Sequence, residues 1–359
     1  MPRSLIVRLA LPALVTLVTA AAGAGTDPAP DAAAGVDPDL VSPFTFAASG
    51  AKAEREAHDA AEAEASGAKV IGGQLAEDGA WPWQVALTVA DMPVSTDSQF
   101  CGGSLVLDQW VLTAAHCVHW VDENGKSFDL SPEMFSVVAG TNRLDGSGDR
   151  IPVAAVYHHP QYTENGLDYD IALVRLARAP NVPYKTIEVP DAEFGDILRA
   201  PGTTTIVTGW GLQNGARQAD QLRQTQIQML DRDACNDAML EMRAEEASAS
   251  YAATVNTLSV NYDDAVDLWA RLVEAADRPV TEHMICSGTF AGGKTACSGD
   301  SGGPLVVPLE DGSYIQAGVV SWGLTSSTNK GCNEHALFSI YTDIAAFLPW
   351  LNETIASHP

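Results

Sequence analysis

After residue 69, short apolar runs separated by turn-forming residues dominate the chain. The runs are rich in Val, Ile, Leu and Thr, and Gly, Asn, Asp or Pro lies between them, which is the pattern of β-strands joined by turns. We expect strands at 83–89, 103–107, 134–139, 153–158, 171–176, 204–209, 222–229, 305–307, 315–322 and 337–341. Many short strands with few long helices indicate an all-β barrel or sandwich.

One internal stretch departs from this strand pattern. Residues 264–276 repeat apolar positions at helical spacing, which places Ala265, Leu268, Trp269, Leu272, Val273 and Ala276 on one face. The pair Arg278-Pro279 ends that helix, and residues 237–249 are also helix-prone. We therefore expect a helical insertion around 237–278.

The N-terminal 69 residues have a different composition. Arg3 and Arg8 flank the start of the apolar run 9–20, and small residues at 20–22 suit a signal peptidase. The run is shorter than the roughly 20 residues of a membrane span, so 1–22 is interpreted as a signal peptide, with an uncleaved anchor as the alternative. Residues 23–69, rich in Ala, Asp, Glu, Gly and Pro, are interpreted as a pro-segment or linker. We expect a secreted protein, extracellular or periplasmic, without membrane contact after signal cleavage.

Composition narrows the functional classes. Hydrophobic residues make up 46% of the chain, enough for a core, which excludes wholesale disorder. The 46 acidic and 20 basic residues give a net charge of −26. This charge argues against a nucleic-acid partner, because a polyanion would be repelled.

All six cysteines follow residue 69: Cys101, Cys117, Cys235, Cys286, Cys297 and Cys332. An even number in an exported chain indicates three disulfides, although spacing alone does not settle the pairing. A zinc site is the weaker alternative, because no C-x-x-C pair is present. No ligand spacing links His119, His158, His159 and His335, so we interpret them as surface or packing residues. We expect no metal and no cofactor.

Three short motifs carry candidate chemistry: TAAHC at 113–117, DIAL at 170–173 and GDSGGP at 299–304. A serine hydroxyl such as that of Ser301 needs a base, and a histidine base such as His116 needs a carboxylate, here Asp170, to orient it. The glycines around Ser301 allow close substrate approach and let backbone N–H groups converge. Each motif alone is weak evidence, but the combination predicts nucleophilic catalysis.

In this order, the motifs resemble the trypsin/chymotrypsin family of serine endopeptidases. The resemblance extends over nearly all of 70–359 through further blocks: VIGG at 70–73, WQV at 83–85, CGGSL at 101–105, TGWG at 208–211, SWG at 321–323 and YT at 341–342. It implies a serine peptidase domain over 70–359 that acts as a monomer on protein or peptide substrates. The implied fold is two six-stranded antiparallel β-barrels with the active site between them and a C-terminal helix.

The resemblance also assigns roles to residues. Ser301 would be the nucleophile, His116 the general base and then acid, and Asp170 the orienting carboxylate. The N–H groups of Gly299 and Ser301 would form the oxyanion hole. Substrate would be bound by Thr295, Ser321, Trp322, Gly323 and Ser339.

The specificity pocket departs from that of trypsin. Six residues before the nucleophile, where trypsin has Asp, this chain has Thr295. Gly323 leaves one pocket wall open, and Ser339 stands where the family often has Gly. We therefore expect a neutral, somewhat narrowed pocket that prefers medium or large uncharged side chains, unless a loop acid such as Glu334 reaches in.

The family's activation mechanism can also be mapped onto the sequence. Cleavage after Lys69 would free the α-amine of Val70, which would pair with Asp300 and order the oxyanion loop. A neutral pocket predicts poor self-activation, so a separate Lys-cutting protease is an expected partner. The resemblance pairs the cysteines as Cys101–Cys117, Cys235–Cys286 and Cys297–Cys332. The family's calcium loop corresponds to 140–150, where Asp145 and Asp149 occur without Glu, so no calcium is expected.

Three alternatives stay open. The chain could be a catalytically inactive homologue that serves as a binding module, although such homologues usually lose a triad residue. It could be an esterase with the same triad, although the strand-pairing segment 321–323 favours extended peptides. The insertion could be a helical decoration packed on the barrel, or a lid or exosite for substrate.

Overall fold

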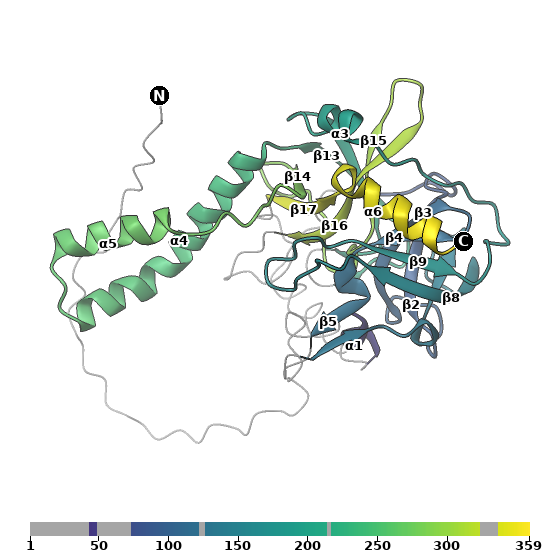
Figure 1. Cartoon of the computed structure of the whole chain (residues 1–359), viewed down its shortest axis with the longest axis horizontal. Coiled ribbons are helices and arrows are strands. Elements are labelled where there is room, and N and C mark those ends of the chain that lie inside the picture. The colour runs from purple at the N-terminus through teal and green to yellow at the C-terminus, as the bar shows by residue number, and fades with distance from the viewer. Residues whose placement is uncertain (1–42, 49–72, 122–125, 214–216, 324–336) are drawn as a thin grey trace, which may run out of the picture. The chain divides into compact units, whose positions relative to one another are not determined.

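The strand-rich region forms two closed antiparallel barrels (Figure 1). The computed structural model describes residues 43–48, 73–121, 126–213, 217–323 and 337–359. The first barrel runs, in spatial order, β2 (Gln84–Val89), β3 (Gln99–Leu107), β4 (Trp110–Thr113), β9 (Ala172–Leu176), β8 (Asp149–His158) and β7 (Phe135–Ala139). The second runs β13 (Arg223–Met229), β10 (Thr204–Gly209), β15 (Pro304–Pro308), β16 (Tyr314–Gly323), β17 (Phe338–Asp343) and β14 (Met284–Gly288). Pairing of β14 with β13 closes this second ring, and β1 (Gln74–Leu75) extends it beside β13. The predicted fold class, two six-stranded barrels with a C-terminal helix, is confirmed.

Burial along the strands explains their sequences. In β13, Thr225, Ile227 and Met229 are buried while Gln226 and Gln228 are exposed, as expected of a strand with one face to the core. Every residue of β2 is buried, and its sequence is correspondingly more uniformly apolar. Each of the ten predicted strands is present, with ends shifted by at most a few residues. The sequence pattern missed two barrel strands, β4 and β14.

Buried polar pairs join the two barrels. The Thr208 hydroxyl of β10 donates to Gln84 Oε1 of β2 at 2.6 Å. The Ser104 hydroxyl of β3 donates to Gln316 Oε1 of β16, also at 2.6 Å. Because unpaired buried polar groups are costly, these bonds specify how the barrels face each other and therefore where a shared site can form.

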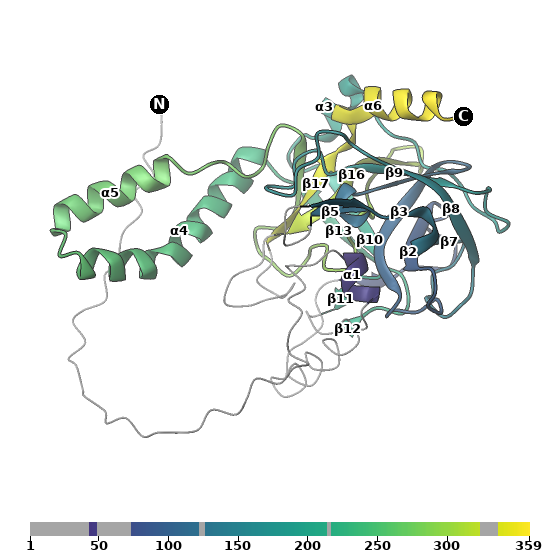
Figure 2. The same cartoon turned by 60° about the horizontal axis from the view of Figure 1, so that its bottom comes forward.

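Short elements decorate the barrels. Two ribbons are formed by β5 (His119–Val121) with β6 (Ser127–Asp129) and by β11 (Leu212–Gln213) with β12 (Arg217–Gln218). Single 3₁₀ turns occur at η1 (Ala115–Cys117) and η2 (Pro132–Met134). Figure 2 shows helix α3 (Ala192–Leu198) beside the C-terminal helix α6 (Ile344–Ser357). Arg199, at the end of α3, forms an ion pair with Asp343, which caps α6.

The predicted helical insertion is present as a hairpin of two helices, α4 (Arg232–Thr257) and α5 (Tyr262–Glu274) (Figure 1). Trp269 of α5 packs on Tyr251 of α4, with ring centroids 4.8 Å apart. Only part of the predicted apolar face is covered, because Leu268 and Leu272 remain 46% and 56% exposed. Among the described residues, no helix combines the length and apolar character needed to cross a membrane.

A short helix lies within the stretch expected to be a linker. Helix α1 (Pro43–Ala48) packs against β3, with the Phe44 and Phe100 rings in edge contact at 5.5 Å. Phe44 and Ala47 are 6% and 1% exposed and belong to the core cluster of the first barrel. The segment before residue 69 therefore contributes to the packing of the domain. The signal peptide 1–22, Lys69, Val70, Cys332 and Glu334 lie outside the described residues.

Candidate active site

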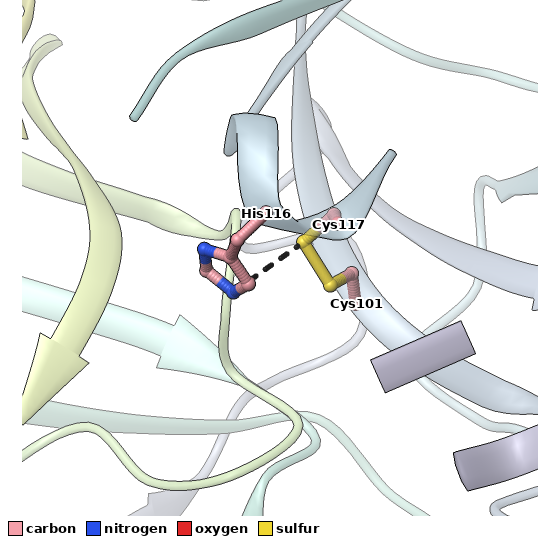
Figure 3. Close-up of side chains that lie close together, drawn as sticks. All are labelled: Cys101, His116 and Cys117. Atoms are coloured by element: carbon pink, nitrogen blue, oxygen red, sulfur yellow. Dashed lines mark hydrogen bonds between the residues drawn. A yellow bond between two sulfur atoms is a disulfide. The ribbon is translucent and has the colours of Figure 1, made fainter. Parts of the chain in front are cut away.

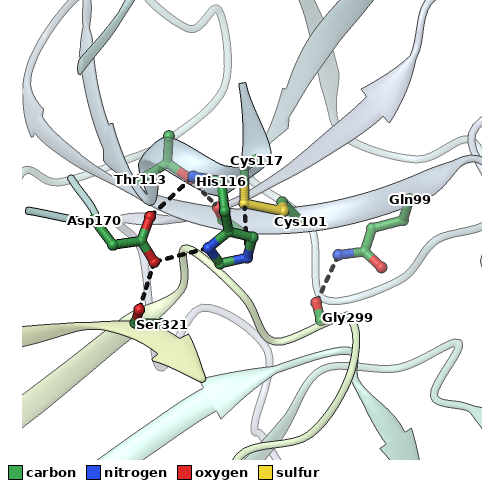
Figure 4. Close-up of a disulfide and its surroundings, with 9 residues drawn as sticks. Gln99, Cys101, Thr113, His116, Cys117, Asp170, Gly299 and Ser321 are labelled. Carbon is green, nitrogen blue, oxygen red and sulfur yellow. Dashed lines mark hydrogen bonds and ion pairs between the residues drawn. A yellow bond between two sulfur atoms is a disulfide. The ribbon is translucent and has the colours of Figure 1, made fainter. Parts of the chain in front are cut away.

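His116 and Asp170 are brought together by the first barrel (Figure 4). His116 lies in η1, directly after β4, and Asp170 precedes β9, which pairs with β4. Asp170 is fully buried, and its Oδ2 lies 2.8 Å from His116 Nδ1. The backbone N–H of His116 donates to Asp170 Oδ1 at 2.9 Å. The carboxylate therefore fixes both the position and the ring orientation of the histidine.

The second barrel also holds Asp170. The hydroxyl of Ser321, on β16, donates to Asp170 Oδ2. The hydroxyl of Thr342, on β17, donates to the backbone carbonyl of Asp170 at 2.6 Å. The sequence analysis placed Ser321 only at the substrate cleft and did not single out Thr342. Both residues couple the orienting carboxylate to the other barrel.

The environment of His116 favours its protonated form. Burial alone lowers the pKa of His116, but the charge of Asp170 and the hydrogen bond to it together raise the pKa above 6.5. A histidine with such a partner becomes a stronger base, and the cation formed when it accepts a proton is stabilised.

Ser301 lies in the turn before β15 and is tied to the first barrel through its backbone. Its carbonyl accepts the N–H of Gly102, on β3, at 2.7 Å. The next residue, Gly302, has φ of 77°, and a Cβ there would lie 2.1 Å from the Thr113 hydroxyl, so glycine is required. Among the described residues, the Ser301 hydroxyl makes no hydrogen bond to His116; such contacts are often long before substrate binds.

The loop before Ser301 is held in a defined conformation. Gly299 has φ of 94°, which only glycine adopts readily. Its carbonyl accepts a hydrogen bond from Gln99 Nε2 at 2.9 Å (Figure 4). In the described part of the chain, the N–H groups of Gly299 and Ser301 donate to no protein acceptor. The contribution of Gln99 was missed, because no motif links it to a residue 200 positions away.

The carboxylate of Asp300 lies beside Gly209 and Gly211, at the end of β10. It accepts the N–H groups of Gly211 and Cys297, each at 2.8 Å. Burial raises the pKa of Asp300 to about 6, and the two hydrogen bonds only partly oppose this shift. Among the described residues no cation pairs with this carboxylate.

Three of the predicted pocket residues lie together. The Thr295 and Ser339 hydroxyls are hydrogen-bonded to each other. Gly323 pairs with Ser339 across β16 and β17, and a Cβ on Gly323 would lie 3.5 Å from the Ser339 hydroxyl. Trp322 precedes Gly323 on the same strand and is half-buried. The described residues predicted to line the pocket thus include two hydroxyls and no charged group.

Two of the predicted disulfides are present. Cys101 is bonded to Cys117, with sulfurs 2.01 Å apart, and Cys235 to Cys286, at 2.05 Å. Cys297 is also disulfide-bonded; its predicted partner, Cys332, lies outside the described residues. The first disulfide lies beside His116, whose Nε2 is 3.9 Å from Cys117 Sγ (Figure 3). This grouping cannot ligate a metal as thiolates, because both sulfurs are consumed by the disulfide.

The acids of the 140–150 loop have other partners. Asp149 forms an ion pair with Arg178 and accepts the N–H of Asn181, both at 2.6 Å. Asp145 accepts the N–H of Ser147 at 3.0 Å. These two carboxylates therefore stabilise the local conformation of the loop.

Comparison with known proteins agrees with this architecture. A sequence model of the trypsin family matches residues 70–351. Transmembrane protease serine 7 of Mus musculus is 28% identical to the chain over 299 residues, which cover 80% of this chain and 29% of that protein. The chain thus spans less than a third of the length of this curated relative. The match over most of the chain, together with the two barrels, establishes that the protein belongs to the trypsin family.

Proposed function

We propose that the protein is a serine endopeptidase in which Ser301, His116 and Asp170 hydrolyse peptide bonds. The observation that carries the proposal is the set of hydrogen bonds to Asp170, a buried carboxylate that accepts from the backbone N–H of His116, from its ring Nδ1 and from the Ser321 hydroxyl. Burying a carboxylate is energetically unfavourable unless its oxygens are hydrogen-bonded. The three donors that converge on Asp170 therefore indicate a functional site. This arrangement disfavours an inactive homologue that acts only as a binding module.

In the proposed reaction, the Ser301 hydroxyl attacks the scissile carbonyl carbon while His116 Nε2 accepts its proton. His116 then gives that proton to the leaving amine, and the C–N bond breaks to leave an acyl-enzyme. Water, deprotonated by His116, hydrolyses the ester and restores Ser301. The negative oxygen formed in each step would be bound by the N–H groups of Gly299 and Ser301, and one such donor typically contributes about 2.7–4 kcal/mol.

Labelling with a fluorophosphonate tests this proposal. The activated protein should be labelled at one site, and Ser301→Ala should abolish the labelling. A matched control is Ser313→Ala, which removes a serine hydroxyl in the exposed turn between β15 and β16. If Ser301→Ala is labelled as strongly as the parent, the nucleophile has been misassigned. Cleavage of peptide amides as well as esters would distinguish a peptidase from an esterase.

The same proposal includes a preference for uncharged side chains at the scissile bond. The hydrogen-bonded pair of Thr295 and Ser339 supports a neutral pocket floor. A buried Lys or Arg side chain would find no charge partner there, and burying an unpaired charge is unfavourable. We expect peptides with Leu, Phe, Tyr or Met at this position to be cut faster than those with Lys or Arg.

We further propose that the protein is exported by residues 1–22 and activated by cleavage after Lys69. The carboxylate of Asp300, which among the described residues is held only by backbone N–H groups, supports the proposal because it can accept the new α-amine of Val70. Lys69→Gln should leave a secreted precursor that a Lys-cutting protease cannot activate. Full activity of that variant would exclude this activation site.

A further inference from the structure

Two histidines and an aspartate converge on one surface of the first barrel. Nδ1 of His119 and Nδ1 of His158 lie 2.7 Å and 3.2 Å from the same carboxylate oxygen, Oδ1 of Asp129. One potential ligand atom from each residue lies within 4.8 Å of the other two. The sequence analysis interpreted both histidines as surface or packing residues, because 39 positions of chain separate them.

The backbone places these groups independently of any ligand. His119 and Asp129 are directly opposite each other on β5 and β6. His158 ends β8, and its ring stacks on that of His119 with centroids 4.2 Å apart. The ring of Tyr162 packs edge-on against His119 from a third direction. The two rings therefore approach the carboxylate from fixed positions.

We propose that His119, Asp129 and His158 bind a Zn²⁺ ion. Histidine nitrogens and carboxylate oxygens bind Zn²⁺ at about 2.0–2.2 Å, so two ligand atoms in a tetrahedron lie roughly 3.3 Å apart. The observed nitrogen-to-oxygen distances of 2.7 and 3.2 Å are shorter than this separation, so the side chains would move apart slightly to admit the ion. Each imidazole would carry its proton on Nε2, which leaves Nδ1 free to coordinate.

The surroundings suit a metal ion with one coordination position open to solvent. The side chain of Asp129 is 64% exposed, so water can fill the fourth place. His283 and Asp168 form another histidine–aspartate pair, in which a single imidazole lies beside the carboxylate.

Such an ion would connect the β5–β6 ribbon to β8. The ribbon pairs only within itself in the described sheets and begins two residues after η1, the turn that carries His116. Zn²⁺ bound across it would hold the ribbon against the barrel. This inference stands apart from the proposed proteolytic activity, because it requires neither Ser301 nor activation.

Titration of the full-length protein with ZnCl₂ by calorimetry tests the site. We expect one Zn²⁺ per chain and a higher melting temperature in its presence. Loss of a partner in the outer shell of a metal site typically costs about 10–100-fold in affinity, so His119→Gln, His158→Gln and Asp129→Asn should each weaken binding at least tenfold. Two controls, His283→Gln and His116→Ala, should bind like the parent.

The melting temperature of each variant without metal is first compared with that of the parent, to show that the variant folds. If a histidine variant fails to fold, Asp129→Asn decides, because this substitution preserves the shape of an exposed side chain. Absence of binding to the parent at millimolar Zn²⁺ would overturn the proposal. Equal binding to the parent and Asp129→Asn, or binding lost in His283→Gln or His116→Ala, would also overturn it.

Discussion

Nδ1 of His283 lies 3.1 Å from the carboxylate of Asp168, the residue two positions before Asp170. The Thr281 hydroxyl donates to the same carboxylate oxygen at 2.9 Å. Between Asp168 and Asp170, Tyr169 has φ of 56°, a left-handed conformation that is costly for a bulky residue. The segment that follows the helical insertion thus holds the loop that carries Asp170.

His283 is therefore predicted to be a positioning residue for Asp170. His283→Ala removes one hydrogen bond to Asp168, worth about 1 kcal/mol, so kcat/KM should fall roughly fivefold. The acidic limb of the pH profile should also move to lower pH, because the raised pKa of His116 depends on Asp170. Both are measured on a chromogenic peptide, with His358→Ala, in the C-terminal tail, as control. An unchanged pH limb in a folded His283→Ala protein would show that the contact is structural only.

The pH dependence of the parent enzyme follows from His116. In the proposed mechanism only neutral His116 accepts the Ser301 proton, so activity declines as the pH falls below its pKa and rises as the pH passes through it. Because the pKa of His116 is raised, the midpoint of kcat/KM should lie above 6.5. Asp170→Asn should lower kcat by about 10⁴-fold, the effect of this substitution in the family's triad. A midpoint below 6 in the parent would contradict this account.

The sequence predicted the parts of the fold and site that are locally encoded. Strands such as β13 alternate buried and exposed residues within seven positions, so their pattern is visible. β4 and β14 were missed because each is short, and β14 reads MICSG, in which neither alternation nor a β-branched run is evident. The triad stays a prediction, and the sequence allowed it to be made because each proposed member lies in a distinctive motif.

Contacts between remote residues could not be read from the sequence. Asp168 and His283 are 115 positions apart and meet only once both barrels have closed. Gln99 lacks any local signature and becomes informative only through its bond to Gly299. Likewise, Phe44 lies in a short apolar segment of a region otherwise poor in large apolar residues, and its burial depends on the first barrel.

A change of pocket charge should change specificity. Thr295→Asp would place a carboxylate where Thr295 now bonds the Ser339 hydroxyl. A substrate Arg would then have a charge partner, and buried pairs with good geometry repay part of their desolvation. The ratio of kcat/KM for Arg over Phe peptides should rise at least tenfold. Ser313→Asp adds the same charge at an exposed turn and should leave this ratio unchanged. A parent that already prefers Arg tenfold would refute the neutral pocket.

The pKa of Asp300 predicts how activation changes stability with pH. Burial raises the pKa of Asp300 from 3.8 to about 6. Between pH 3.8 and pH 6, the folded precursor therefore holds a proton on this carboxyl that the unfolded chain has lost. The contribution of this carboxyl to folding is therefore greatest below pH 4 and is lost as the pH rises through 6. Cleavage after Lys69 would bring the α-amine of Val70, which is protonated up to about pH 7.7–8.0, to the carboxylate and remove the penalty. The gain in stability on cleavage should thus be larger at pH 7 than at pH 4, by on the order of 1–3 kcal/mol.

Urea unfolding of Ser301→Ala protein measures this difference, because the inactive variant cannot digest itself. The precursor and the form cut by a Lys-specific protease are compared at pH 4 and pH 7. A Lys69→Gln version treated with the same protease controls for cleavage elsewhere and should unfold like the untreated precursor. A stability gain that is equal at both pH values would mean that the new amine does not reach Asp300. Cleavage at Lys69 would then not order the oxyanion loop by the proposed route, because that route requires an ion pair between the new amine and Asp300.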